Sequence, residues 1–267
     1  TKNLVIIPHE NLHKVPFEAL LTKMPEKGNL DFLFSDATDY RNLPYLINRS
    51  FLLGRNSDLE IHAPEGADTI IQSINNMLRL ENDYREEHHG KDIIDSKYGV
   101  GIPFEINLSG KKETVVYEKD GIRISAFDVR HDPIEPAFGF KIEYNGKKVI
   151  LSGDTRKNEN VLAQSQNADL LVHEVMAMDF FKNLSQIQTD LGNDRNAKIL
   201  IAITDYHTSP RDVAEIAESA NVKKLVLNHL APSPDNWLLK NLFLKEMKGV
   251  YDGEIILAED GDFFFVR

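Results

Sequence analysis

The hydrophobic positions in the middle of the chain follow the pattern of β-strands. Apolar and β-branched residues are concentrated in three stretches, 104–108, 114–129 and 138–152. Asp120-Gly121 interrupts the second stretch and Asn145-Gly146 the third, and such pairs are typical of two-residue hairpin turns. The pattern therefore predicts antiparallel strands joined by tight turns.

Further along the chain, strand patterns alternate with a helical one. Continuous apolar runs at 168–175 and 223–230 predict buried strands, and residues 209–220 between them have helical spacing behind a Ser-Pro start. Residues 253–267 predict a closing hairpin over Asp260-Gly261. Hairpins followed by strand–helix–strand units imply an α/β (α+β) fold, with helices packed on a mixed sheet.

The first hundred residues combine short strand patterns with helical ones. Residues 58–64 alternate like a strand, residues 66–85 have helical spacing, and His88-His89 fall in a charged stretch that predicts a linker. Nearer the start, residues 4–7 predict a strand and residues 17–21 a short helix.

The start of the chain also contains the zinc-peptidase pattern His-Glu-x-x-His, from His9 to His13. In a peptidase this pattern works on a helix, which places both imidazoles on one face. Pro8 and Pro16 leave room for at most two helical turns. We therefore interpret these histidines as part of a strand-to-helix connection.

The composition of the chain excludes or disfavours several kinds of chemical site and of binding partner. The 267 residues contain no cysteine, which excludes disulfides, thiolate metal sites and thiol nucleophiles, and the net charge of −11 disfavours broad attraction to nucleic acid or anionic membrane. No apolar run is long enough to span a membrane, and no signal peptide is visible. These two observations slightly favour the cytoplasm. Because the chain opens on Thr1, its natural start can lie further upstream.

Candidate chemistry lies just after apolar strands. His131, Asp154 and His229 each follow a predicted strand, and His207 follows the apolar run at 199–204, which predicts one more. Loops at strand ends commonly carry reactive groups because the sheet holds them rigidly. Imidazole and carboxylate ligands suit Zn²⁺, Fe²⁺ or Mn²⁺.

These four residues lie in segments that resemble the metallo-β-lactamase superfamily, in particular its ribonuclease Z-like branch. The segments are "GRNSDLEIHAPEG", "AFDVRHDPIEPAFGFKIE", "VILSGDT", "ADLLVHEV" and "YHTSPRDVAEIAESANVKKLVLNHLAP". The resemblance covers about residues 51–267. It implies that His131, Asp154 and His229 are metal ligands, with Asp154 bridging two ions and so also catalytic, and that His207 is the proton donor. His173 and Glu174 would orient a ligand or His207 from behind.

The branch's first metal motif, His-x-His-x-Asp-His, is missing from the sequence. Residues 3–48 instead resemble a fragment of a CHAT domain, a caspase-like module. This gives two expected domains, a CHAT-like strand–helix segment at 1–50 and, at 51–267, an incomplete metallo-β-lactamase αββα sandwich.

The resemblance implies a metal-dependent hydrolase, acting with one or two Zn²⁺ on a phosphodiester of nucleic acid or on a small ester, and a homodimer is possible. Without the first motif, we expect weak metal binding and impaired catalysis. Two alternatives remain open: a non-catalytic remnant or binding module, and a CHAT-type peptidase or interaction domain, which the lack of cysteine opposes.

Overall fold

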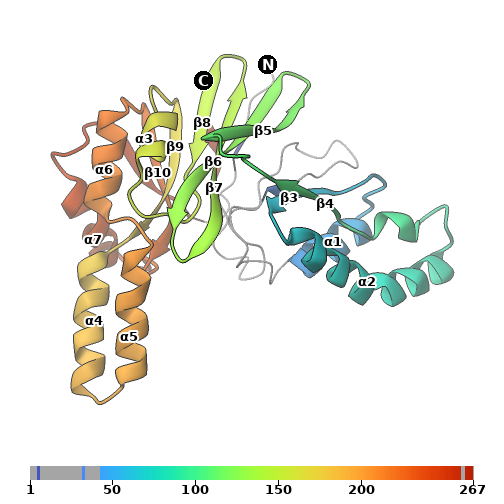
Figure 1. The fold of residues 1–267 in the computed structure, drawn as a ribbon, viewed down its shortest axis with the longest axis horizontal. Helices are drawn as coiled ribbons and strands as arrows, with labels where there is room; N and C mark the ends of the chain where they lie inside the picture. The colour runs from blue at the N-terminus through green and yellow to red at the C-terminus, as the bar shows by residue number, and fades with distance from the viewer. Residues whose placement is uncertain (1–4, 7–31, 34–42, 260–261, 267) are drawn as a thin grey trace.

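The structure is a computed structural model that describes residues 5–6, 32–33, 43–259 and 262–266 (Figure 1). The histidines of the His-Glu-x-x-His pattern and the helix expected at 17–21 lie outside these residues. The rest is a mixed α/β arrangement, which confirms the predicted fold class.

The main sheet has seven strands in the order β11-β10-β9-β8-β7-β6-β5. Strands β5 to β8 pair antiparallel, and β8 to β11 pair parallel. Their bounds are β5 Glu113–Lys119, β6 Ile122–His131, β7 Ile134–Tyr144, β8 Lys147–Leu151, β9 Leu170–Met176, β10 Lys224–Ala231 and β11 Glu254–Leu257. The two predicted turns are confirmed, because Asp120 and Asn145 have φ of 53° and 49° and are each followed by a glycine of positive φ.

Three helices cover one face of this sheet: α3 (Glu159–Gln164), α6 (Pro210–Ser219) and α7 (Trp237–Met247) (Figure 1). Buried side chains of α6 and α7, among them Val213 and Phe243, pack on sheet residues such as Leu225. Helix α6 begins as predicted, because the Ser209 side chain accepts a hydrogen bond from the Asp212 amide and Pro210 occupies the first turn.

The opposite face carries a second core, to which Phe138, Val226 and Phe264 belong. Phe264 comes from β12 (Phe264–Phe265), which pairs with β1 (Val5–Ile6), while β11 pairs with β10. The predicted closing hairpin is therefore wrong. The two strands join different sheets, and a local pattern of apolar residues does not specify the pairing partner.

A separate group of elements has its own core (Figure 1). It contains α1 (Leu43–Leu52), α2 (Ala67–His89), the short 3₁₀ helix η1 (Ser96–Tyr98), and the parallel sheet of β2 (Phe32–Leu33), β3 (Glu60–Pro64) and β4 (Ile102–Ile106). His88 and His89 lie in the last turn of α2, exposed to solvent, not in a linker as predicted. Helix α1 continues through residue 50, and a domain boundary at that point stays a prediction.

Between β9 and α6 the chain forms two paired helices that extend away from the sheet, α4 (Met178–Asp190) and α5 (Asp194–Ala202), followed by the 3₁₀ helix η2 (Ile203–Asp205) (Figure 1). The strand predicted at 199–204 is thus wrong: a short apolar run fits either state, and packing against α4 selects the helix. No helix in the described part of the chain is long and apolar enough to cross a membrane, and the compartment stays a prediction.

Candidate active site

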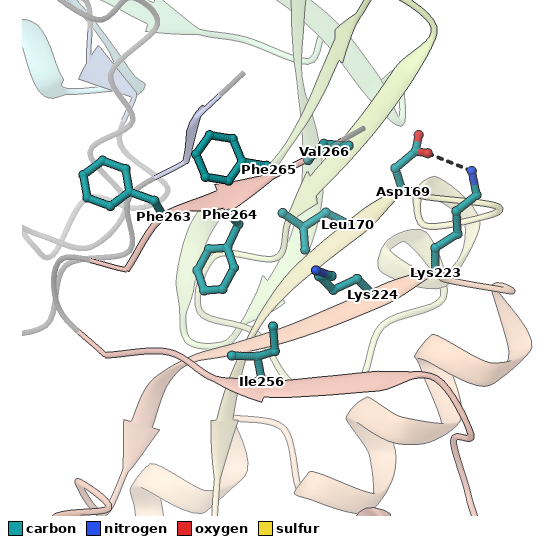
Figure 2. A pocket seen from close by; sticks show the side chains of 9 residues that line it. All are labelled: Asp169, Leu170, Lys223, Lys224, Ile256, Phe263, Phe264, Phe265 and Val266. Carbon is teal, nitrogen blue, oxygen red and sulfur yellow. Dashed lines mark hydrogen bonds and ion pairs between the residues drawn. The ribbon is translucent and has the colours of Figure 1, made fainter. Parts of the chain in front are cut away.

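A cavity of about 610 Å³ lies where strands β9 and β10 begin (Figure 2). It is lined by apolar side chains, including Phe264 and Ile256, and by Asp169, Lys223 and Lys224. Asp169 accepts hydrogen bonds from Lys223 Nζ at 2.7 Å and from the Lys148 amide at 2.9 Å. Burial alone would raise the pKa of Asp169, but these bonds outweigh it and the pKa is lowered. This end of the sheet contains a cavity, but its acidic side chain is already bound by a lysine and a backbone amide.

The predicted site residues gather at the opposite edge of the sheet. Strands β6 and β8 to β10 run in the same direction, so their carboxyl ends share that edge. His131 is the last residue of β6, and Asp154 lies in the loop after β8. His229 lies within β10, at an irregularity in the pairing with β9, and has φ of 43°.

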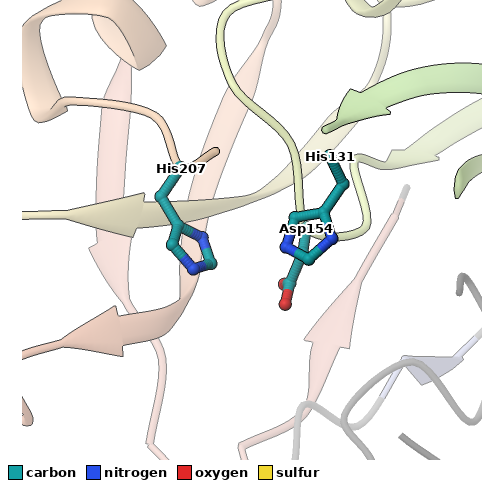
Figure 3. Close-up of side chains that lie close together, drawn as sticks. All are labelled: His131, Asp154 and His207. Carbon is teal, nitrogen blue, oxygen red and sulfur yellow. The ribbon is translucent and has the colours of Figure 1, made fainter. Parts of the chain in front are cut away.

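Three side chains converge there: His131, Asp154 and His207 (Figure 3). One ligand atom from each lies within 4.8 Å of the others. Donors about 2.1 Å from a tetrahedral ion are about 3.4 Å apart, so small side-chain rotations would close this group around a metal. Both imidazoles are buried, which favours a fixed geometry. The donor set and its spacing fit a borderline metal such as Zn²⁺.

His229 lies at the open side of the same cluster. Its Nε2 is 3.4 Å from Asp154 Oδ2, its ring centroid is 5.4 Å from that of His207, and 46% of its side chain is exposed. The structure therefore brings together all three predicted ligands and the predicted proton donor. Which imidazoles bind the metal stays a prediction, because His207 has a ligand atom within 4.8 Å of both His131 and Asp154, and His229 Nε2 is 3.4 Å from Asp154.

The Glu174 side chain contacts this cluster through His207. Its carboxylate is fully buried, accepts a hydrogen bond from the Thr208 amide at 2.7 Å, and has Oε2 3.2 Å from His207 Nδ1. Burial raises the pKa of Glu174 to about 8, against the smaller opposing influence of His229. The contact turns Nδ1 of His207 towards Glu174 and Nε2 away from it, as a ligand or a proton donor at the site requires.

His173 is placed differently from its neighbour, because successive side chains of a strand point to opposite faces. It is fully buried, and its Nδ1 lies 2.7 Å from the Glu174 carbonyl oxygen, to which it donates. Burial lowers the pKa of His173 to about 4, so the ring is neutral near pH 7. Its role in orienting the site stays a prediction.

Several supporting residues were missed in the sequence. Thr208 Oγ1 donates to the Thr155 carbonyl oxygen at 2.5 Å, and Thr155 Oγ1 accepts from the Arg130 amide at 3.1 Å. The Tyr206 ring packs against His131, with centroids 4.8 Å apart, and against His207 at 4.9 Å. The available signal was position: each of these residues is adjacent in sequence to a residue of the converging group.

The family model of the beta-lactamase superfamily domain matches residues 42–230. This chain belongs to the beta-lactamase superfamily. Ribonuclease Z of Mycolicibacterium paratuberculosis is 29% identical over 175 residues, which are 66% of this chain and 56% of that protein. Ribonuclease Z of Mycobacterium marinum is 26% identical over the same share of each. The chain thus spans little more than half the length of these relatives, and within the superfamily it is similar to ribonuclease Z.

Two solved structures are similar in fold. The metallo-β-lactamase fold protein YhfI from Bacillus subtilis has a TM-score of 0.56 and 16% identity, covering 88% of this chain and 76% of that one. Human tRNase Z, short form, has a TM-score of 0.55 and 18% identity, covering 89% of this chain and 79% of that one. The family match begins at residue 42, and the resemblance of residues 3–48 to a CHAT domain gains no support from it.

Proposed function

We propose that this chain is a metal-dependent hydrolase of phosphodiesters, with nucleic acid or a small ester as substrate. The observation that carries the proposal is the convergence of His131, Asp154, His207 and His229 at the carboxyl edge of the sheet. The similarity to ribonuclease Z supports the phosphodiester as substrate class. Assembly as a homodimer is part of the same proposal and has no support from the described residues.

In our proposal His131, Asp154 and His229 hold the ion, most simply Zn²⁺, with Mn²⁺ and Fe²⁺ as alternatives. A metal in such a site supplies Lewis acidity, which lowers the pKa of a water molecule and stabilises charge on phosphoryl oxygens. His207 carries a proton on Nε2 to the leaving oxygen, and Glu174 fixes the imidazole orientation through Nδ1.

The sequence also supports a reduced version of this function. The motif His-x-His-x-Asp-His is missing from the chain, so the ligands that it provides in relatives must be replaced or absent. We therefore propose that metal binding is weak, and that a binding module without catalysis is the second candidate.

The test separates binding from chemistry. Purified protein is titrated with Zn²⁺ and with Mn²⁺, and hydrolysis of bis(p-nitrophenyl) phosphate is followed. If the roles are as proposed, His229→Ala weakens metal affinity, whereas His207→Ala preserves affinity and lowers the rate by about a hundredfold. Asp169→Asn, at the other end of the sheet, is the matched control.

Three results decide between the candidates. Metal binding without turnover favours the binding module. Loss of affinity in His207→Ala assigns that imidazole as a ligand instead. Absence of metal binding in the wild-type protein rejects the hydrolase.

A further inference from the structure

Tyr206 lies beside the converging group and is not explained by the proposed chemistry. It follows η2 and precedes His207, so it joins the α4–α5 pair to the site. The backbone beyond it is fixed, because the Thr208 amide donates to Glu174 and the Thr208 carbonyl oxygen accepts from the Met176 amide at 2.9 Å. These bonds hold the backbone of this segment beside the converging group.

The three rings form a triangle in which the Tyr206 ring is nearer to each imidazole ring than the two imidazole rings are to each other. Its centroid is 4.8 Å from that of His131, at an interplanar angle of 74°, and 4.9 Å from that of His207, at 54°. The two imidazole centroids are 5.7 Å apart. Tilted and edge-on contacts of this kind are favourable for aromatic rings and restrict their rotation.

Rotation of these imidazoles is what the site must prevent. Strand β6 fixes the backbone of His131, but the ring can still turn about its last side-chain torsion, which has a broad preference. Glu174 contacts the Nδ1 side of His207 and leaves the ring faces to other neighbours. Tyr206 occupies the space beside both rings.

We propose that Tyr206 is a positioning residue whose ring holds His131 and His207 so that their nitrogens converge with Asp154. The inference rests on the proposed metal site, and it assigns the role to the ring and not to the hydroxyl group. Tyr206 is half-buried, and its ring contacts both imidazoles.

The experiment compares four variants with the wild-type protein: Tyr206→Phe, Tyr206→Leu, Tyr206→Ala, and Tyr84→Ala as a control on an exposed tyrosine of α2. Zn²⁺ affinity is measured by competition with a fluorescent chelator. We expect Tyr206→Ala and Tyr206→Leu to bind Zn²⁺ at least about tenfold more weakly, and Tyr206→Phe and Tyr84→Ala to stay within about threefold of wild type. Tyr206→Leu retains apolar bulk, which guards against simple loss of folding.

A second measurement uses the metal-free protein. The carbon-bound ring protons of His131 and His207 are observed by NMR in protein labelled at histidine. We expect the nuclear Overhauser effects between the His131 and His207 rings, whose centroids are 5.7 Å apart, to weaken in Tyr206→Ala and Tyr206→Leu, where the rings are free to turn, and to be preserved in Tyr206→Phe.

The inference is overturned if Tyr206→Ala binds Zn²⁺ like the wild type, if Tyr206→Phe is as weak as Tyr206→Ala, or if the Overhauser effects between the two histidine rings persist in Tyr206→Ala and Tyr206→Leu. If wild-type protein binds no Zn²⁺, the proposed function fails. The NMR comparison then decides the inference alone.

Discussion

A partly buried acidic residue, Asp169, lies at the amino ends of strands β9 and β10, and a fully buried one, Glu174, lies at their carboxyl ends. The two residues have different kinds of partner. At the amino ends, Asp169 is bound by Lys223, and Lys147 Nζ lies 3.4 Å from it. At the carboxyl ends, Glu174 faces His207 and an amide. Lysines near pH 7 are fixed cations, so they neutralise Asp169 permanently, whereas an imidazole can gain or lose a proton in this range.

The cavity and the converging donors lie at opposite ends of these strands. The cavity of about 610 Å³ lies at the amino ends (Figure 2), and the converging donors lie at the carboxyl ends (Figure 3). The charged side chains that line this cavity include Asp169 and Lys223, which are paired with each other and so are not free to react with a ligand. The carboxyl ends are the candidate site because possible metal-ligand atoms converge there, not because of volume.

The largest expected difference between the two ends concerns Glu174→Ala. Removal of this buried carboxylate deprives the Thr208 amide and His207 of their shared acceptor, so we expect the free energy of unfolding to fall by about 3 kcal/mol. Urea denaturation measures the change. Glu254→Ala, which removes an exposed partner of Lys224, should cost less than about 0.5 kcal/mol. Equal losses in the two variants would remove the contrast.

The pH dependence of stability should reveal His173. Its pKa is about 4 in the folded protein and about 6.5 in an unfolded chain, so between these values the unfolded state binds the extra proton. The contribution is complete above about pH 6.5 and is lost on acidification by up to about 1.4 kcal/mol per pH unit.

Chemical denaturation at several pH values measures this slope, and His173→Gln should be less sensitive to acid than the wild type. The lowered pKa of Asp169 acts in a different window, because its contribution is lost only below the ordinary range of an aspartate. A wild-type slope identical to that of His173→Gln would show that the imidazole has the same pKa in the folded and unfolded states, against this prediction.

A smaller effect is expected for Asp169→Ala at the amino ends. The Lys148 amide loses its acceptor and two lysines lose a partner, so we expect a loss of about 1–2 kcal/mol in unfolding free energy. Zn²⁺ affinity should not change. Asp154→Ala should show the reverse pattern, with lost affinity and a small change in stability, and a change of Zn²⁺ affinity in Asp169→Ala would contradict the separation of the two ends.

Local features of the fold were predictable, and features that depend on distant partners were not. The Asp120-Gly121 and Asn145-Gly146 turns follow from backbone preferences of those residues alone. The helical state of residues 199–204 depends on packing against α4, and the partner of β12 is β1, at the other end of the chain. Neither can be obtained from a short apolar run.

The same division holds for the site. His131 and Asp154 could be identified because they lie at or shortly after the end of a predictable strand, and His207 because it precedes a recognisable helix start. Tyr206 and Thr208 could not, because their roles arise only where the loop before α6 meets β6 and β9. The grouping of His207 with His131 and Asp154, and the position of His229 next to Asp154, are likewise properties of the folded chain.

The smallest expected effect tests whether the amino ends are an ordinary surface. Lys224 Nζ lies 3.1 Å from Glu254 Oε2, but 31% and 56% of the two side chains are exposed. Solvent screens such a pair, so Lys224→Ala should change the unfolding free energy by less than about 0.5 kcal/mol, and added salt should abolish even that difference. Urea denaturation at low and high salt measures both quantities. A salt-independent loss above about 1.5 kcal/mol would mean that Lys224 belongs to a buried network, and the charges around this cavity would then resemble those around Glu174.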